Sequence, residues 1–432
     1  MAPPHVHRLA FYCAIVLLSP RFALPADTTA SSSTRAAKAE WPQWRGPSRN
    51  AISAETGLLR EWGKDGPPLL WKMSGLGKGF SSVAVSGGKI FTLGERKKSA
   101  VLIALDEKDG KELWAMKVGG GSPNSTPTVD GDLVYALGRD GDLVSCESST
   151  GKELWRKNFE KDFGGKMMSG WGYSESPLVD GEKLVCTPGG KDAVIVALEK
   201  KTGKVIWKAA KPEQIGPNGQ DGAGYSSMVT SEACGTRQYV QLMGRGVISV
   251  SARDGRFLWA YNRIANGTAN IPTPVTSGDY VFCSSGYGAG AALLKVERAG
   301  DGLKADEVYF LPSKTVQNHH GGMVLVGDYI YFGHGQNQGF PTCIEMKTGK
   351  IAWQPGRGPG EGSAAVLFAD GNLYFRYESG VMALIEANPE KYVLKSTFKI
   401  PSHLAESWPH PVIAGGRLYL RDQEVLLCYD LK

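Results

Sequence analysis

Short apolar runs alternate with polar turns from about residue 67 to the C-terminus, a pattern typical of antiparallel β-strands joined by tight hairpins. One unit recurs: an apolar run, an Asp-Gly or Thr-Gly turn, and a return run with an aromatic, as in residues 104–114 (ALDEKDGKELW). Glycine tolerates positive φ and Asp or Thr caps the bend, so each copy predicts a hairpin. In five copies a tryptophan stands four residues after the glycine: Trp114, Trp155, Trp207, Trp259 and Trp353.

A second periodic signal lies between these tryptophans. Glycine, a polar residue and an alternating aliphatic and aromatic run follow one another in residues 87–91, 131–135 and 181–185, and further copies start at Gly278, Gly327, Gly371 and Gly415. Two hairpins per unit make a four-stranded antiparallel blade, and repeats of about 46 residues build a β-propeller. Residues 67–432 have room for eight such units. The predicted fold class is therefore all-β, an eight-bladed β-propeller of four-stranded antiparallel blades.

The two ends of the repeat region predict how the ring closes. Residues 428–432 stop before the return strand of their unit, whereas residues 69–72, with Trp71, are a return strand with no blade before it. An open ring would leave sheet edges unpaired and an apolar face uncovered. We therefore expect the N-terminal strand to join the C-terminal blade. Residues 307–310 stand where one further tryptophan is missing.

The repeat Ala-x-Asp-x-x-(Thr/Asp)-Gly-Lys-x-x-Trp resembles the tryptophan-docking motif of the eight-bladed PQQ-type propellers, a superfamily that includes quinoprotein alcohol dehydrogenases and BamB. The resemblance covers residues 67–432. It implies a structural role, with packing between neighbouring blades, for Trp71, Trp114, Trp155, Trp207, Trp259 and Trp353. Residues 41–47 (WPQWRGP) and 55–59 (ETGLL) also resemble the leader of secreted PQQ-like repeat proteins.

The N-terminal region divides into three segments before the propeller domain of residues 67–432. Residues 1–26 have the character of a signal peptide, since the apolar run of residues 9–18 is too short to span a bilayer; a short membrane anchor is the alternative. Residues 27–40 are a linker, and residues 41–66 are an ordered strap packed on the propeller, with a sugar-stacking role of Trp41 and Trp44 as the alternative. The mature chain is expected to be periplasmic or extracellular, without a transmembrane segment.

Charge and cysteine usage exclude several classes of function. The net charge of +6 falls to +4 when Arg8 and Arg21 leave with residues 1–26, and the basic residues are dispersed, so no nucleic-acid partner is predicted. Six cysteines remain without an adjacent pair or a CxxC motif, which indicates neither zinc nor c-type haem. We expect buried thiols and leave a disulfide open as the alternative.

Candidate chemistry lies in the loops that enter the innermost strands, because these loops converge on one mouth of the central channel. Aromatic, amide and ionisable side chains gather there, and for each of them a plain polar loop is the competing interpretation. Adjacent histidines on a strand would point to opposite faces, so a metal site is not predicted. The ligand-binding candidates are Asn124, Trp171, Tyr173, Glu175, Tyr225, Asn270, His319, His320, Trp408 and His410.

The resemblance to the dehydrogenases implies pyrroloquinoline quinone (PQQ) beneath a disulfide of adjacent cysteines, with calcium held by Glu, Asn and Asp. This chain has Glu175 and Asn270 but no adjacent cysteines and no matching aspartate. The sequence therefore predicts no cofactor and no catalytic residue. It predicts a monomeric binding or scaffold module at the cell envelope whose partner is a protein or a carbohydrate. The alternatives are a PQQ-dependent oxidoreductase and a carbohydrate-active enzyme that uses the Glu and His loops.

Overall fold

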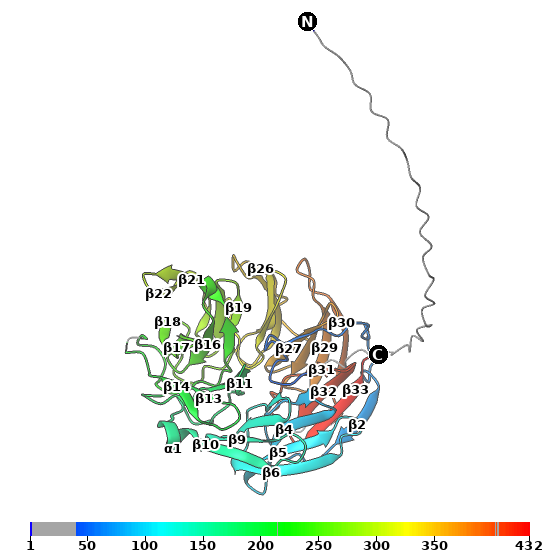
Figure 1. Cartoon of the computed structure of the whole chain (residues 1–432). Helices are drawn as coiled ribbons and strands as arrows, with labels where there is room; N and C mark the ends of the chain where they lie inside the picture. Colours follow the sequence, from blue (N-terminus) through cyan, green and yellow to red (C-terminus); the bar gives the residue numbers. More distant parts are fainter. Residues whose placement is uncertain (2–39, 214, 402, 404–405) are drawn as a thin grey trace. The chain divides into compact units, whose positions relative to one another are not determined.

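The computed structural model describes residues 1, 40–213, 215–401, 403 and 406–432 (Figure 1). The predicted signal peptide, residues 1–26, and the linker up to residue 39 lie outside these residues, apart from Met1. From residue 40 onward the chain forms eight sheets, which confirms the all-β eight-bladed propeller. Two short helices accompany them, α1 (Phe159–Phe163) and the 3-10 helix η1 (Ala233–Gly235). No helix within the described residues is long and apolar enough to cross a membrane.

Each blade is a four-stranded antiparallel meander whose strands follow one another from the inner to the outer edge. Blade 1 consists of β3 (Ala84–Ser86), β4 (Lys89–Arg96), β5 (Ser99–Asp106) and β6 (Glu112–Gly120), and blade 2 consists of β7 (Thr128–Asp130), β8 (Leu133–Leu137), β9 (Asp142–Glu147) and β10 (Glu153–Asn158). Blade 3 consists of β11 (Leu178–Asp180), β12 (Lys183–Cys186), β13 (Ile195–Glu199) and β14 (Val205–Ala209), and blade 4 consists of β15 (Val229–Ser231), β16 (Gln238–Met243), β17 (Gly246–Ser251) and β18 (Phe257–Tyr261).

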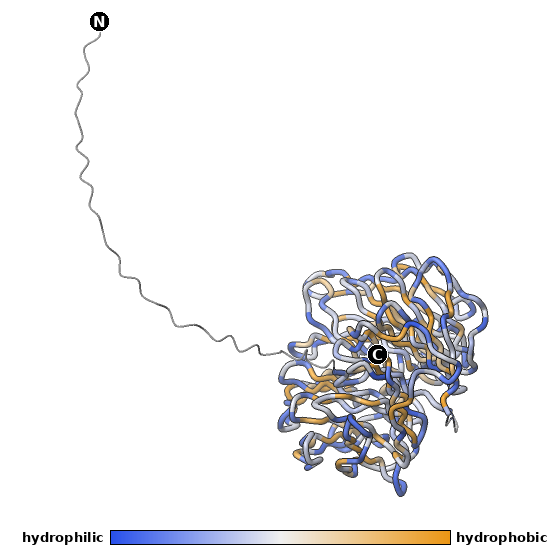
Figure 2. The backbone as a smooth tube through the Cα atoms, turned by 90° about the vertical axis from the view of Figure 1, so that its right-hand side faces the viewer, coloured by the Kyte–Doolittle hydropathy of each residue, from blue (hydrophilic) through white to orange (hydrophobic). Residues whose placement is uncertain are grey.

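Blades 5 to 8 continue the ring in chain order. Blade 5 consists of β19 (Val275–Ser277), β20 (Tyr280–Ser285), β21 (Gly290–Ala299) and β22 (Gly302–Leu311), and blade 6 consists of β23 (Met323–Val326), β24 (Tyr329–His334), β25 (Phe340–Glu345) and β26 (Ile351–Trp353). Blade 7 consists of β27 (Ala364–Ala369), β28 (Asn372–Tyr377), β29 (Val381–Glu386) and β30 (Leu394–Lys399), and blade 8 consists of β31 (Val412–Ala414), β32 (Arg417–Asp422), β33 (Val425–Asp430) and β2 (Leu69–Met73). Figure 2 shows the apolar stretches of the chain mainly in the interior of the propeller and hydrophilic stretches mainly at its periphery.

Blade 8 closes the ring as predicted. Its outer strand β2 comes from the N-terminal side of the propeller and pairs antiparallel with β33, with Trp71 opposite Cys428. Figure 1 shows β2 in blue beside β33 in red. The N-terminal side of the repeat region therefore supplies the outer strand that the C-terminal blade lacks, and all eight blades have their four strands.

A β-bulge recurs on the outer strand of every blade. In blade 1 Ala104 pairs with Trp114 and Leu105 pairs with Glu112, so Leu113 is left without a partner across the ladder. The same irregularity appears between the third and fourth strands of the other seven blades. A bulge re-aims the side chains beside it. Leu113 is accordingly 47% exposed, while the neighbouring Trp114 turns toward the next blade.

The re-aimed aromatic lies on the glycine of the next blade's Asp-Gly or Thr-Gly turn. A β-carbon at Gly151 would lie 2.5 Å from Cε3 of Trp114, and the indole N–H of Trp114 donates to the carbonyl of Ser148 at 3.2 Å. Tyr309 takes the place of the missing tryptophan over Gly349. The same ring-on-glycine contact is formed by Trp71 with Gly110, Trp155 with Gly203, and Trp207 with Gly255.

Two of the six tryptophans pack differently. Trp259 donates its indole N–H to Gln238 within its own blade at 2.7 Å, and the glycines at the tip of the longer hairpin of blade 5, Gly300 and Gly302, have no ring against them. Trp353 donates to the carbonyl of Asn388 at 2.7 Å and packs against Tyr392 in blade 7. Five of the six tryptophans therefore contact the turn between the third and fourth strands of the next blade.

Blade 7 has no docking aromatic of its own, and the strap supplies one. Ser396 stands at the docking position of β30, and its Oγ accepts a hydrogen bond from the backbone N–H of Trp62 at 2.9 Å. The Trp62 ring packs on Tyr374, with centroids 5.7 Å apart, as Trp155 packs on Tyr135 at 6.2 Å. A tryptophan far away in the sequence thus replaces the missing repeat residue.

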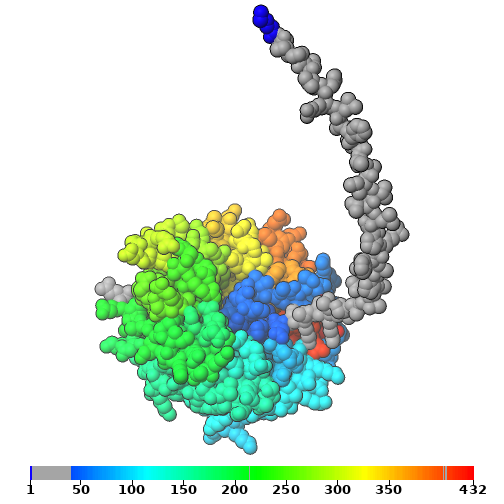
Figure 3. Space-filling model, in the orientation of Figure 1, coloured from blue at the N-terminus to red at the C-terminus, as the bar shows by residue number. Residues whose placement is uncertain are grey.

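The first half of the strap, residues 41–53, runs through the central channel (Figure 3, blue). Trp41 and Val85 exchange two backbone hydrogen bonds at the inner edge of blade 1. Strand β1 (Ile52–Ser53) adds a parallel strand to β27 at the inner edge of blade 7. We expected a strap packed on the propeller; this half of it fills the middle of the ring and contacts the inner strands.

Two buried arginines anchor the strap inside the channel. Arg45 donates to the carbonyl of Met323 in blade 6. The Arg49 guanidinium donates to the side chain of Gln43 and to three carbonyls at the start of blades 3 and 4, which belong to Ser176 (2.8 Å), Pro177 (3.1 Å) and Met228 (2.8 Å). Arg49 thereby satisfies the carbonyls of Ser176 and Met228, and it shares the Pro177 carbonyl with the hydroxyl of Thr128 in β7.

Substitution of the glycine under a docking tryptophan should destabilise the protein far more than substitution of a glycine that has a similar backbone conformation but open space around it. Gly151 has φ 72° and Gly131 has φ 58°, but a β-carbon at Gly131 would meet no atom within 4 Å. We expect Gly131→Ala to cost about 1 kcal/mol of unfolding free energy from left-handed strain alone, and Gly151→Ala to cost about 3 kcal/mol. Urea denaturation of the two variants measures the difference, and equal costs would contradict the docking contact.

Removing the Arg49 guanidinium should destabilise the propeller although the residue belongs to no blade. Arg49→Met removes the donor from the buried carbonyls of Ser176 and Met228, while the Pro177 carbonyl keeps its bond from Thr128 Oγ1 at 2.6 Å, so we expect a cost of about 2 kcal/mol or more. Arg253→Met is the matched control, because the Arg253 side chain is 85% exposed and forms its ion pair only with the neighbouring Asp254. If both variants unfold at the same urea concentration, the strap does not hold the blades together.

Candidate functional site

Chain direction determines which loops share the site. In a meander blade, the loop that enters the inner strand and the hairpin between the second and third strands emerge at the same face. The Asp-Gly and Thr-Gly turns emerge at the opposite face. One face of the propeller therefore carries two sets of loops around the channel mouth, and the other carries the short turns.

A cavity of about 570 Å³ opens at the loop face, and we call it the mouth cavity. It is within the usual size range of small-molecule sites, about 300–1,000 Å³. Seven of the ten predicted ligand-binding residues line it: Asn124, Trp171, Tyr225, His319, His320, Trp408 and His410.

A ladder of stacked rings forms one wall of the mouth cavity. Phe80 stacks on Trp408 with ring centroids 4.4 Å apart, and Trp408 lies 4.4 Å from His320. His320 lies 3.6 Å from His319, whose ring meets Tyr287 edge-on at 5.0 Å. These five rings come from loops of blades 1, 8, 6 and 5, so the wall exists only when the ring of blades is closed.

Both histidines of the adjacent pair line the cavity. Residues 318–320 form an irregular loop and not a strand, so the alternation that would have separated the two side chains does not apply. His319 is fixed on both nitrogens, by Ser363 Oγ at 2.9 Å on Nδ1 and by the Tyr287 hydroxyl at 3.0 Å on Nε2.

The opposite wall is built around Trp171, which is 51% exposed at the rim. The Tyr225 hydroxyl accepts a hydrogen bond from the backbone N–H of Trp171 at 3.3 Å, and their rings meet at 76°. Asn124 donates from its side-chain amide to the Trp171 carbonyl at 3.1 Å and to Ser174 Oγ at 3.0 Å. Asn124 and Tyr225 thus hold the loop that presents Trp171.

The strap provides the floor of the mouth cavity. Trp44 lines the cavity, and its ring lies 5.5 Å from the ring of His410. The guanidinium of Arg45 lies against the Trp44 ring, 5.3 Å from its centroid.

Three candidates lie outside the mouth cavity. Tyr173 is buried against Phe159, and its hydroxyl donates to the carbonyl of Pro188 at 2.9 Å. The Glu175 carboxylate is buried and accepts the backbone N–H of Thr187. Asn270 is fully buried and holds its own loop by bonds to backbone carbonyls and to neighbouring side chains. These residues shape the propeller beneath the loops.

Several residues that line the mouth cavity are absent from the site predicted from the sequence. Arg139, Tyr287, Asn337 and Glu378 come from hairpins between second and third strands, whereas the prediction considered only the inner-strand loops. The meander topology would have revealed them, since these hairpins reach the same face as the inner-strand loops. Phe80 and Glu406 were missed although they lie in or beside inner-strand loops. Trp44 could not be found in this way, because it belongs to no repeat.

Burial keeps the histidines of the mouth cavity uncharged at neutral pH. It lowers the pKa of His319 to about 4 and places the pKa of His320 well below its usual range. The pKa of His410 is lowered to about 3 by burial and by the nearby Arg45 charge. Burial has the opposite effect on an acid, and it raises the pKa of Glu175 to about 7.

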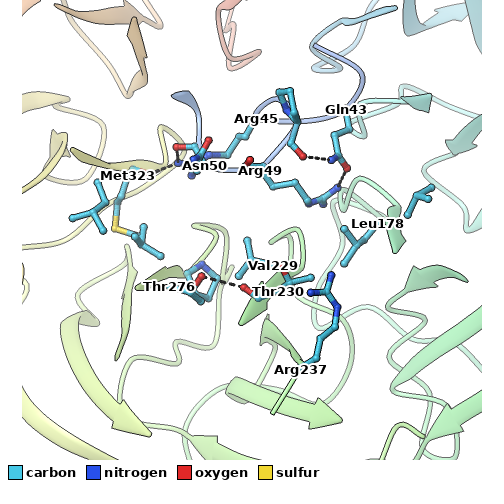
Figure 4. Close-up of a pocket in the computed structure, with 16 residues that line it drawn as sticks. Gln43, Arg45, Arg49, Asn50, Leu178, Val229, Thr230, Arg237, Thr276 and Met323 are labelled. Atoms are coloured by element: carbon cyan, nitrogen blue, oxygen red, sulfur yellow. Dashed lines mark hydrogen bonds between the residues drawn. The ribbon is translucent and has the colours of Figure 1, made fainter. Parts of the chain in front are cut away.

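A second cavity, of about 250 Å³, lies on the other side of the strap, and we call it the strap cavity (Figure 4). Gln43, Arg45 and residues 47–50 line it together with residues in and beside the inner strands of blades 3 to 6. Arg45 extends toward Met323, and Arg49 extends toward Gln43. The strap cavity shares no lining residue with the mouth cavity, so the strap divides the channel in two.

The described residues do not fit the cofactor arrangement that the dehydrogenase resemblance implies. Cys186, Cys283 and Cys343 are buried on strands of three different blades, and no two cysteines are adjacent. Within the described residues no group of three or more His, Cys, Asp or Glu side chains is arranged to hold a metal ion. Glu175 and Asn270, the two expected ligands, are engaged in internal hydrogen bonds.

Fold and repeats together define this chain as an eight-bladed propeller of the PQQ-repeat type. The family model described as outer membrane protein assembly factor BamB matches residues 55–140 and 97–355. The chain therefore belongs to this BamB-like family of PQQ-repeat β-propellers.

Individual relatives are distant. The outer membrane protein assembly factor BamB of Shewanella oneidensis is 28% identical over 308 residues, 71% of this chain and 70% of the relative. The BamB structure from Moraxella catarrhalis aligns with a TM-score of 0.58 at 13% identity over 82% of this chain and 94% of its own. A quinohemoprotein alcohol dehydrogenase from Comamonas testosteroni aligns with a TM-score of 0.63 at 13% identity, over 91% and 80%. The two structural likenesses show the fold alone.

The pKa values predict opposing effects of acid on stability. The folded-state pKa values of His319, His320 and His410 lie below 6.5, so these histidines take up protons more readily in the unfolded state. Their contribution to the unfolding free energy is therefore complete above pH 6.5 and is lost as pH falls toward 4. The pKa of Glu175 is raised from 4.5 to about 7, so its contribution grows as pH falls from 7 to 4.5. Each group changes the unfolding free energy by about 1.4 kcal/mol per pH unit, and three histidines outweigh one glutamate.

We therefore expect the urea midpoint to fall between pH 6.5 and 4.5. In Glu175→Gln the fall should be steeper, because the opposing contribution is gone, and in His410→Gln it should be shallower. The exposed Glu232, which is ion-paired at the surface, gives the control Glu232→Gln. Identical pH profiles for Glu175→Gln and the wild-type protein would contradict the buried, protonated glutamate.

Proposed function

We propose that this protein is an exported binding module of the cell envelope that holds a ligand in the mouth cavity and acts there as a scaffold. The observation that carries the proposal is the cavity itself. Loops of several blades and the strap meet to line one depression with aromatic rings and hydrogen-bonding groups. A propeller that only had to stay folded would need none of these rings at its solvent-exposed mouth.

The envelope location and the scaffold role draw on the relatives. Those matched over about 70% of the chain are named as outer membrane assembly factors, which places them beside proteins of the envelope. An exported chain with a signal peptide at residues 1–26 fits that location, as does a partner that is a protein or a carbohydrate of the envelope. A monomeric state remains our prediction.

The proposal predicts that loss of the mouth-cavity rings impairs the cell envelope while the protein still folds. In the source organism, deletion of the gene should increase uptake of the fluorescent dye 1-N-phenylnaphthylamine. The wild-type gene should restore the barrier, and Trp171→Ala and Trp408→Ala should restore less than half of it. Phe257→Ala is the matched control, since Phe257 is a 39% exposed aromatic on the outer strand of blade 4.

Two measurements make the result decisive. Fractionation and immunoblotting check that every variant is exported at the wild-type level, and thermal denaturation checks that Trp171→Ala is as stable as the wild-type protein. Full restoration by both cavity variants would show that the mouth cavity does not serve the envelope role. A wild-type protein found in the cytoplasm would contradict the location.

A further inference from the structure

The walls of the mouth cavity have the chemistry of a site for sugar rings. The ladder from Phe80 through Trp408 to His319 lines the cavity mainly with ring edges, because its rings stack on one another, and Trp171, which is 51% exposed, offers an accessible ring at the rim. Aromatic faces stack on the C–H faces of sugars, which are apolar although the ring is edged with hydroxyls. Between the rings lie amide and hydroxyl groups from short loops, among them Asn124, Asn337 and Ser122. Such groups both donate and accept, as sugar hydroxyls do.

Electrostatics favours an uncharged ligand. The three histidines of the wall are neutral, because burial lowers the pKa of each one. Arg139 is the single lysine or arginine among the residues that line the mouth cavity, and two glutamates, Glu378 and Glu406, line it as well. Arg45 lies against the Trp44 indole and bonds to Met323, and it does not itself line the cavity. A polyanion would therefore meet more negative than positive charge, and burying unpaired charge is costly.

Several polar atoms of the wall have no partner within the described residues. They are Nδ1 of His320, Nδ1 of His410 and Nε1 of Trp408. All three belong to side chains that line the mouth cavity, in the loops that enter blades 6 and 8. Buried polar groups without a partner are uncommon in folded proteins, and a ligand rich in hydroxyls would be suited to pair with groups of this kind after small ring movements.

The strap closes the inner end of the mouth cavity. Trp44 lies at its floor, and the strap cavity beyond shares no lining residue with it, so a polymer cannot thread through the channel. A long chain must therefore enter by one of its ends, with the remainder leaving through the mouth at the loop face.

We propose that the mouth cavity binds the terminal sugars of an uncharged glycan, end-on, with Trp171 as the stacking face and the ladder as the apolar wall beside the sugar. This inference rests on the proposed function, that the mouth cavity holds a ligand, and it names the class of that ligand. The stacking residues select ring-shaped polyols, the neutral wall rejects acidic ones, and the strap selects chain ends over internal stretches.

The test measures binding of defined probes to the purified full chain by tryptophan fluorescence and calorimetry. The neutral probes are the linear hexamers of maltose-, cellulose-, laminarin- and chitin-type sugars. An oligogalacturonate hexamer is the acidic probe, and an extended Ser-Gly-Thr-Ala-rich decapeptide is the protein-like probe. We expect at least one neutral hexamer to bind at one site per chain, and at least ten-fold more tightly than the oligogalacturonate and the peptide.

Variants locate the binding site, and modified probes show which end of the glycan enters it. Trp171→Ala and Trp408→Ala should each weaken the bound hexamer at least ten-fold, while Phe257→Ala leaves its affinity unchanged. Trp171→Ala serves if Trp408→Ala does not fold, because Trp171 is half exposed. The same hexamer with bulky groups at both ends should lose at least ten-fold in affinity, whereas a group at one end alone should be tolerated at one of the two ends.

Each alternative outcome separates this inference from the proposed function. Binding of only the peptide or only the acidic probe, lost in Trp171→Ala, would overturn the glycan class and leave the proposed function standing. Full affinity for the doubly blocked hexamer would overturn end-on binding. If no probe changes the fluorescence and the cavity variants also restore the envelope barrier fully, both the inference and the proposed function are wrong.

Discussion

The contact on which the whole structure depends is an aromatic ring lying on a glycine of the next blade. It requires two features at once: a bulge that turns the aromatic sideways, as at Leu113, and a turn residue without a side chain, as at Gly151. Because each such contact joins one blade to the next, the repeats fix the angle between blades as well as their internal fold. The position of every loop at the channel mouth follows from that angle.

Where the repeats fail, the strap compensates. Trp62 packs at the docking position of blade 7, and Arg45 and Arg49 donate to carbonyls at the inner edges of blades 6, 3 and 4. The segment that closes weak points of the ring is the same segment that carries Trp44 to the floor of the mouth cavity. Under the proposed function, ligand binding would add to stability, because a ligand in contact with Trp44 would also restrain the strap.

The sequence was sufficient for the features that repeat and insufficient for those that occur once. Hairpins, blades, ring closure by β2 and the face on which the loops gather follow from periodicity and chain direction. Seven of the ten candidate side chains line one cavity because equivalent loop positions meet around one axis. Tyr173, Glu175 and Asn270 do not, because periodicity locates a loop and not the direction of each side chain in it. The path of the strap and the role of Trp62 carry no repeat signal and needed the structure.

The same reasoning explains how one fold holds different sites. The docking contacts lie on the outer strands, and the mouth cavity is built from loops and from the strap, so the loops can change without disturbing the contacts between blades. In this chain most residues at the mouth are rings without charge and short polar side chains, with Arg139, Glu378 and Glu406 as the charged exceptions, whereas Glu175 and Arg49 lie deeper and bind backbone groups. A family likeness established from the outer strands therefore gives no information on the ligand, which must be inferred from the loops of each member.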